Sequence, residues 1–213
     1  MTPWMTTITG RDHYLTSPAA LLYRNAPSIG EVAHALALIN RFTGHTKRPY
    51  SVAEHSLLVC DIVRAQGLTA SAQLAALLHD AHEALVGDVG TMHKQALGMA
   101  WVEFENLHAH LVREAFGIRT ASQAYRAAIK AADLRALATE RRDLTGYQPG
   151  SSRTWPVLDS PDAEVQPLQS IDLMAEPRCA MTWLHHRDAF VRRYEQLTAT
   201  QPALDEPTTE ALA

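Results

Sequence analysis

The chain has few cysteines and no long apolar run. Cys60 and Cys179 are its only cysteines among 213 residues, so a disulfide framework is excluded and a reducing, cytoplasmic setting is expected. The opening stretch, MTPWMTTITGRDHYL, lacks a basic segment followed by an apolar run, and we expect no secretory signal. No apolar stretch approaches the roughly 20 residues that span a bilayer, so we expect no membrane association.

The sequence also lacks clusters of positive charge. It holds 19 Lys and Arg against 23 Asp and Glu, a formal net charge of −4, and the basic residues do not gather along any predicted helix. This distribution argues against a surface that binds duplex nucleic acid. A small anionic substrate remains possible, because it needs only a local cationic pocket.

The remaining composition is that of a globular protein, with 46% hydrophobic and 20% charged residues. The length suits one domain over residues 1–200, and the final residues, 201–213, are expected to be disordered. Apolar spacing predicts an all-α fold with a short hairpin near residues 6–15. The predicted helices cover residues 31–42, 51–66, 70–86, 96–116, 122–145 and 176–197.

Capping signals mark several of these boundaries. Ser51 and Glu54 have the spacing of a capping box at the start of the second helix. Thr69 is a predicted N-cap, and Gly87 a predicted stop. Residues 88–95 are predicted as a loop. Residues 147–170 contain four prolines and are predicted as a long irregular connection.

Four residues on three predicted helices form a candidate metal site. His55 shares a helical face with Leu58 and Ile62, and Asp133 shares one with Ile129 and Leu137. The adjacent pair His79-Asp80 belongs to an alanine-rich helix whose apolar face includes His79. Imidazole nitrogens and carboxylate oxygens are ligands for Mn, Fe, Co, Ni or Zn.

The alternative is a helical bundle without a metal. A single inward-facing histidine is more often a hydrogen-bonded core residue, and a single buried aspartate is more often ion-paired. The four residues could therefore pair among themselves. A shared divalent ion explains all of them at once, so we expect one transition metal bound by His55, His79, Asp80 and Asp133.

Two further carboxylates are candidates for catalysis. Glu83 lies one helical turn after His79, where it could act as a general base or as the acid for a leaving group. Asp88 follows Gly87 and could orient water or protonate the leaving oxygen, although a role as a turn residue is equally compatible with its position.

Cationic and aromatic residues supply candidates for substrate binding. Arg41 and Lys94 could neutralise phosphoryl oxygens, and His45 in the next loop could contact phosphate or ribose. Trp155 could cover the pocket or anchor the proline-rich connection, and anchoring is favoured. His108 and His110 are expected at the surface.

The order H…HD…D resembles the HD-domain metal-dependent phosphohydrolases. The stretch HDAHEALVGDVGTMHK, residues 79–94, is similar to bacterial 5′-deoxynucleotidases and related phage deoxynucleotide triphosphohydrolases. Residues 48–59 and 129–140 resemble their first metal-histidine helix and the helix of their final aspartate. The resemblance covers roughly residues 31–145, the expected metal core.

The resemblance implies a helical fold around one divalent metal and catalytic roles for Glu83 and Asp88. It also implies that an arginine beside an aromatic residue, here Arg41-Phe42, reaches the substrate, and that the protein is a homodimer or higher homo-oligomer. The family usually has tryptophan where this chain has Phe42, which keeps a stacking face but loses the indole N–H. Gly90 and Met92 stand where a proline-containing loop is usual.

We therefore expect an enzyme that hydrolyses nucleotides, with deoxynucleoside 5′-monophosphates as the leading substrate class. A deoxynucleoside triphosphate hydrolase is the alternative within the same chemistry, in which Lys47, Arg48 and Lys94 could receive the outer phosphates. A non-catalytic metal domain that senses a nucleotide is the alternative from another class.

Overall fold

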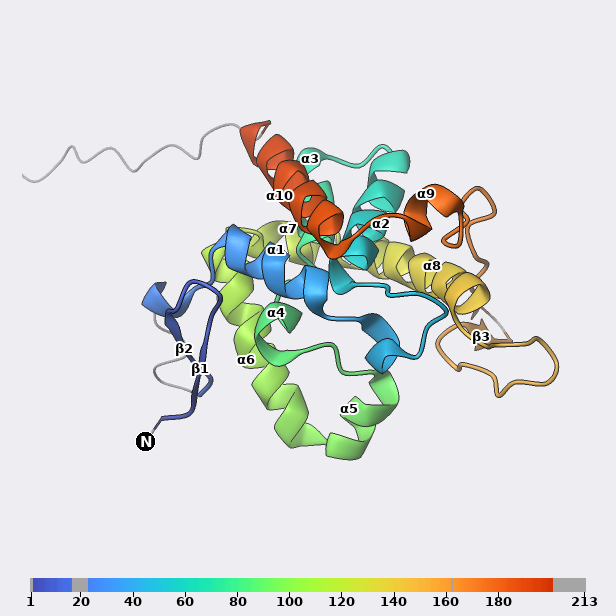
Figure 1. The fold of residues 1–213 in the computed structure, drawn as a ribbon, viewed down its shortest axis with the longest axis horizontal. Helices are drawn as coiled ribbons and strands as arrows, with labels where there is room; N and C mark the ends of the chain where they lie inside the picture. Colours follow the sequence, from blue (N-terminus) through green and yellow to red (C-terminus); the bar gives the residue numbers. More distant parts are fainter. Residues whose placement is uncertain (1, 17–22, 162, 201–213) are drawn as a thin grey trace, which may run out of the picture.

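Ten α-helices build the part of the chain that the structure describes, residues 2–16, 23–161 and 163–200 (Figure 1). The structure is a computed structural model, and its mostly helical architecture confirms the predicted fold class. The expected disordered tail, residues 201–213, lies outside these residues. The helices are α1 (Ile29–Leu38), α2 (Val52–Ala65), α3 (Ala70–Leu77), α4 (Glu83–Val86), α5 (Thr91–Leu97), α6 (Met99–Ala115), α7 (Arg119–Ala124), α8 (Arg126–Leu144), α9 (Glu176–Cys179) and α10 (Trp183–Ala199).

Two short antiparallel pairs accompany the helices. Strands β1 (Trp4–Thr6) and β2 (Asp12–Tyr14) form the expected N-terminal hairpin, with Met5 opposite His13. Strands β3 (Asp159–Ser160) and β4 (Ala163–Glu164) form a second, two-residue pairing. This pairing lies within the proline-rich connection, which is otherwise irregular as predicted.

The start of α2 uses only half of the expected capping box. The Ser51 side chain accepts a hydrogen bond from the Glu54 backbone N–H at 3.2 Å. The buried Glu54 carboxylate instead accepts two 2.8 Å hydrogen bonds from Arg48. It also lies 3.5 Å from Arg178 and 3.4 Å from His186. Glu54 therefore ties the C-terminal helices α9 and α10 to the start of α2.

The helix expected over residues 70–86 is broken, which corrects that prediction. The chain leaves α3 after Leu77 and forms tight turns, with an i to i+3 hydrogen bond of 2.9 Å from Glu83 N–H to Asp80 O. The His79 ring hydrogen-bonds the Ala76 carbonyl at 2.8 Å, and this bond competes with continuation of the helix. The α4 helix then ends at Gly87, whose positive φ of 85° suits glycine.

Other predicted boundaries also shift. The expected loop 88–95 is helical from Thr91, because α5 consists largely of good helix formers and its Lys94 is held by Glu105 of α6 at 2.5 Å. The helix expected over residues 122–145 begins earlier and divides into α7 and α8. The last predicted helix likewise divides into α9 and α10.

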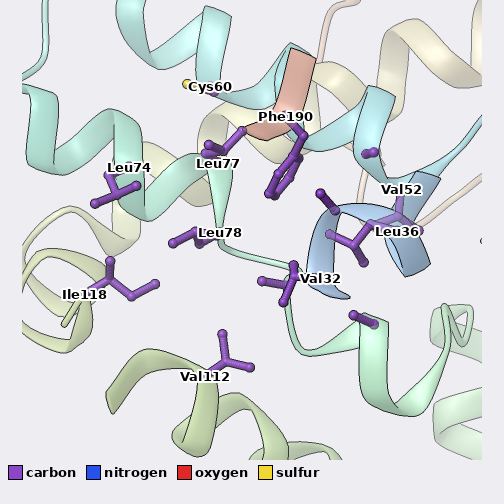
Figure 2. Close-up of a cluster of buried hydrophobic side chains, with 14 of the residues drawn as sticks. Val32, Leu36, Val52, Cys60, Leu74, Leu77, Leu78, Val112, Ile118 and Phe190 are labelled. Atoms are coloured by element: carbon purple, nitrogen blue, oxygen red, sulfur yellow. The ribbon is translucent and has the colours of Figure 1, made fainter. Parts of the chain in front are cut away.

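Helix α2 lies between two apolar clusters, and this placement buries the middle of the helix. Its Val52 and Cys60 belong to one cluster, and its Leu58, Val59 and Ile62 belong to the other. Figure 2 shows the first cluster, in which Phe190 of α10 lies among side chains of α1, α2 and α3. Most of α2 from Val52 to Val63 is therefore shielded from water, while its last turn, with Arg64 and Ala65, is exposed.

Among the described residues, no helix is both long enough and apolar enough to cross a lipid bilayer.

Candidate metal centre

Three of the four predicted ligands meet at one point. His55 comes from α2, and His79 and Asp80 come from the turn between α3 and α4. The His55 Nε2 atom lies 3.3 Å from His79 Nε2 and 3.5 Å from Asp80 Oδ2. The His79 Nε2 atom lies 3.0 Å from the same Asp80 oxygen. These three donor atoms, all within 4.8 Å of one another, form a group that could hold a metal ion.

The break between α3 and α4 makes this convergence possible. Two consecutive residues of a regular α-helix point about 100° apart, so a continuous helix would separate His79 from Asp80. The tight turn brings both side chains to the same side. The irregular backbone at residues 78–82 therefore helps to form the site.

Asp133 lies at the edge of this group. Its Oδ1 atom is 3.4 Å from His55 Nε2, and its Oδ2 atom accepts a 2.8 Å hydrogen bond from Lys130. The group of atoms within 4.8 Å of one another contains His55, His79 and Asp80 only. Asp133 thus contacts the site through His55, in agreement with its predicted inward position.

The two histidines direct their Nε2 atoms toward the same point. The His55 Nδ1 atom is 2.5 Å from Glu140 Oε1, and the His79 Nδ1 atom is 2.8 Å from the Ala76 carbonyl oxygen. Both partners are acceptors, so in the neutral rings each Nδ1 carries the proton and each Nε2 carries a lone pair. Because the pKa of His55 is raised to about 9, an ion bound by both rings would displace a proton from His55 Nε2. Ligands about 2.1 Å from one ion lie roughly 3.0–3.4 Å apart, so the observed spacings fit a transition metal.

Glu140 is a central residue that the sequence analysis missed. It is fully buried on α8, and it accepts hydrogen bonds from Tyr50 Oη at 3.0 Å and from Arg41 Nε at 3.2 Å, besides its contact with His55. A carboxylate that receives the second N–H of a metal-binding histidine fixes the orientation of the ring. Glu140 lies seven residues after Asp133, on the same face of α8, and that spacing is a signal the sequence carried.

The charges around Glu140 compensate one another. Burial alone would raise the pKa of Glu140, but Arg41, His55 and Tyr50 hold it below its usual value. Burial and Arg41 lower the pKa of His55, while Glu140 and Asp133 outweigh them and raise it to about 9. The site thus holds buried carboxylates that attract a cation.

Arg41 lies between the metal group and the Phe42 ring. Its NH1 atom is 3.7 Å from Asp80 Oδ2, and its NH2 atom is 3.2 Å from Glu140 Oε2. Burial alone would lower the pKa of Arg41, but Glu140, Asp88 and Asp80 raise it, so the guanidinium stays charged. Arg41 thus lies next to the candidate ligand Asp80, and its predicted contact with phosphoryl oxygens stays a prediction.

The two predicted catalytic carboxylates, Glu83 and Asp88, are both influenced by the charges of Asp80 and Arg41. Glu83 begins α4 and is buried, and its Oε2 atom has no hydrogen-bond partner among the described residues. Burial raises the pKa of Glu83 well above its usual value, and the negative charges of Asp80 and Asp88 raise it further. Burial also raises the pKa of Asp88, despite the opposing charge of Arg41. Glu83 is therefore poised to carry a proton.

The remaining predicted site residues differ in their placement. Lys94 is engaged by Glu105 and does not extend freely into the site. His45 ends the 3-10 helix η3 (Arg41–Gly44) with an exposed side chain. The half-buried Phe42 ring lies 5.6 Å from the Arg41 guanidinium carbon and 6.1 Å from the centroid of Trp155.

Two relatives resemble the chain over much of its length, and no family model matches it. The uncharacterized protein RCAP_rcc00048 of Rhodobacter capsulatus is 34% identical over 190 residues, which cover 86% of this chain and 94% of that protein. The uncharacterized protein YfdR of Escherichia coli K12 is 37% identical over 131 residues, which cover 62% of this chain and 67% of YfdR. At this identity and coverage, the chain belongs to the same protein family as RCAP_rcc00048.

Proposed function

We propose that this protein is a metal-dependent phosphohydrolase of the HD-domain type that hydrolyses deoxynucleoside 5′-monophosphates to nucleoside and phosphate. The observation that carries the proposal is the buried group of His55, His79 and Asp80, with its donor atoms within 4.8 Å of one another. Arg41 and the carboxylate of Glu83 lie beside this group. The scarcity of cysteine favours the cytoplasm as the place of action.

His55, His79 and Asp80 would hold the ion, and Asp133 is the candidate for a fourth ligand. When bound, a divalent ion acts as a Lewis acid that activates water and draws charge from a phosphoryl group. Glu140 orients His55 for this task through Nδ1, and the Ala76 carbonyl orients His79. Nitrogen and carboxylate ligands suit Mn, Fe, Co, Ni or Zn.

Arg41 is the candidate for binding the phosphoryl group. Glu140 engages Nε and NH2 of its guanidinium, which leaves NH1 directed toward Asp80 and the metal group. A guanidinium held in this way presents N–H donors to an anionic oxygen without losing side-chain freedom on binding. Arg41 would thus neutralise charge on the phosphate beside the ion.

Glu83 is the candidate for the proton donor. A leaving alkoxide needs a proton, and a carboxyl group with a raised pKa still carries one near neutral pH. The Glu83 Oε2 atom is buried and has no partner among the described residues, so it can donate to a leaving oxygen that enters the site. Asp88 would assist by orienting the attacking water.

The contacts of three cationic side chains, Arg48, Lys47 and Lys94, favour a monophosphate substrate over a triphosphate substrate. Arg48 is bound to Glu54, Lys47 donates to the Asp143 carbonyl at 2.8 Å, and Lys94 is bound to Glu105. These three residues were the candidates for receiving outer phosphates. Each has a partner elsewhere, so a long phosphate chain would have to displace existing ion pairs or hydrogen bonds.

The experiment is a phosphate-release panel on the purified chain with each of the five metals. It compares deoxy- and ribonucleoside mono-, di- and triphosphates for the native protein, Asp80→Ala and Asp188→Ala. We expect metal-dependent release from deoxynucleoside monophosphates, a loss of at least about a hundredfold in Asp80→Ala, and native activity in Asp188→Ala, whose exposed carboxylate lies on α10. Full activity in Asp80→Ala would refute the mechanism.

The same panel separates the alternatives. Release of pyrophosphate or triphosphate from a deoxynucleoside triphosphate would favour the triphosphate hydrolase. Nucleotide binding without hydrolysis, in a protein that retains a stoichiometric metal, would favour the sensing domain. A purified protein that takes up no transition metal would favour a bundle in which these histidines and carboxylates pair among themselves.

A further inference from the structure

A cluster of aromatic rings lies beside the metal group. The centroids of Phe42 and Trp155 are 6.1 Å apart, and those of Trp155 and Tyr147 are 6.4 Å apart. We call these three residues the aromatic cluster. All three side chains are partly exposed, so the cluster offers ring surface to a ligand and is not part of the protein core.

Arg41 connects the aromatic cluster to the metal group. Its guanidinium carbon is 5.6 Å from the Phe42 ring centroid, and its NH1 atom is 3.7 Å from Asp80 Oδ2. One guanidinium group therefore separates the Phe42 ring from the candidate ligand Asp80, and Trp155 lies on the other side of Phe42. A substrate with its phosphate at Arg41 has its remaining part within reach of the rings.

The backbone around Phe42 is strained. Phe42 and Thr43 have φ values of 56° and 54°, in the left-handed region that non-glycine residues rarely occupy. Such a conformation costs about 1–3 kcal/mol per residue and is concentrated at ligand-binding sites. Hydrogen bonds on both sides hold it, from Arg41 N–H to Tyr50 O and from His45 N–H to Phe42 O, each 2.9 Å. The strain sets the direction of the Phe42 ring.

Trp155 is anchored through its backbone by a largely shielded ion pair. Arg141 is bound to Asp159 at 2.6 Å, and the same Asp159 oxygen accepts the Trp155 backbone N–H at 2.6 Å. Leu158 is fully buried and fixes the intervening turn. The Arg141 guanidinium also stacks on Tyr147, 4.2 Å from the ring centroid. Trp155 therefore both anchors the proline-rich connection, as predicted, and presents its ring next to Phe42.

We propose that the aromatic cluster of Phe42, Trp155 and Tyr147 is a stacking subsite for the nucleobase of the substrate, with Trp155 as its main contact. This inference deepens the proposed function and rests on it. The positive charge of Arg141 is neutralised by Asp159, so the subsite favours a neutral, planar ring over a second phosphate. Stacking on aromatic rings accepts every base, because each base has a π-face. The substrate class is therefore nucleotides of several bases, in preference to sugar phosphates.

The kinetic test compares a deoxynucleoside 5′-monophosphate with 2-deoxyribose 5-phosphate, which lacks the base. We expect Trp155→Ala to lower the ratio of kcat/KM for the nucleotide to that for the sugar phosphate by about 5- to 100-fold, the range typical of one stacked base. Trp155→Phe should retain most of the ratio. Trp183→Ala, which removes a partly exposed tryptophan on α10, should leave the ratio as in the native protein.

A binding measurement tests the subsite independently of hydrolysis. Nucleosides without phosphate are titrated into the native protein, Trp155→Phe and Trp183→Phe, with tryptophan fluorescence as the signal. Saturable quenching that disappears in Trp155→Phe and persists in Trp183→Phe supports the subsite, even if no phosphate ester is hydrolysed. Hydrolysis with a ratio unaffected by Trp155→Ala, together with no saturable quenching, would overturn the subsite and leave the proposed function standing.

Discussion

Among the residues of the candidate metal centre, Glu140 contacts three other side chains, those of His55, Tyr50 and Arg41. It holds the ring of His55, the hydroxyl of Tyr50 and the guanidinium of Arg41 while remaining fully buried itself. One carboxylate therefore positions both a candidate metal ligand and the candidate phosphate-binding cation. The helical spacing from Asp133 could have identified Glu140, but its three partners come from segments far away in sequence, and no local pattern connects them.

Replacing Glu140 by glutamine should weaken both functions of this residue. An amide keeps the size of the side chain but cannot balance the charges of His55 and Arg41, so we expect metal affinity and kcat to fall by about 10- to 100-fold. Metal content after dialysis and phosphate release measure the two effects. Glu195→Gln, at an exposed position of α10, is the control.

A merely structural role for Glu140 would give a different result. In that case the glutamine variant would lose thermal stability, yet its folded fraction would bind metal with native affinity. The ratio of bound metal to folded protein therefore distinguishes a positioning residue from a packing residue.

At the level of elements, the N-terminal hairpin packs against α6 through His13 and His108. The position of His108 corrects a prediction made from the sequence. His108 of α6 was expected at the surface, but it is fully buried 5.5 Å from the ring of His13 in β2. The Nδ1 atoms of His13 and His108 hydrogen-bond the backbone carbonyls of Asn25 and Phe104. The surface prediction for His108 was wrong because the hairpin that covers it comes from a distant part of the chain.

Acidification should loosen this attachment. Burial, together with the charges of His108 and Arg11, lowers the pKa of His13 from 6.5 to about 4, against the opposing effects of the Asn25 carbonyl and Glu31. Glu31 has a pKa of about 2 and stays ionised throughout this range. Between pH 6.5 and 4 the unfolded chain binds a proton at His13 that the folded chain does not, so stability rises with pH in this window and is lost as the pH falls.

Urea unfolding at pH 7 and pH 5 measures this contribution. His13 alone should lower the free energy of unfolding by about 2 kcal/mol over this interval. His13→Asn can keep the donor to the Asn25 carbonyl but cannot titrate, so the difference between the two pH values should shrink by a similar amount. An unchanged difference would show that His13 takes up its proton as readily in the folded state as in the unfolded state, and so has no lowered pKa.

At the level of the whole molecule, the last helix completes the core that supports the site. Helix α10 packs against α1, α2 and α3, and its Phe190 is fully buried among their side chains (Figure 2). Helix α2 carries His55, and α3 is followed directly by the turn that carries His79. The expected homo-oligomer stays a prediction, which light scattering of the purified chain can test.

Phe190→Ala should destabilise the whole fold. Loss of a buried phenylalanine ring costs about 3–5 kcal/mol, and we expect a reduction of this size in the free energy of unfolding measured by denaturant titration. Leu184→Ala, at a side chain of α10 that is 42% exposed, should cost about 1 kcal/mol or less. Equal effects of the two substitutions would show that α10 does not complete the core.

The sequence alone determined the helical class, the hairpin and three candidate ligands that meet, His55, His79 and Asp80, because apolar spacing shows which side chains of a helix face inward. Three features became clear only from the tertiary structure. The helix breaks so that His79 and Asp80 point to the same side, and Glu140 contacts both His55 and Arg41. An aromatic cluster lies next to Arg41. These features depend on contacts between segments up to about a hundred residues apart, such as the 3.2 Å bond between Arg41 and Glu140. Local propensity carries no information about such contacts, since they form only when the helices pack.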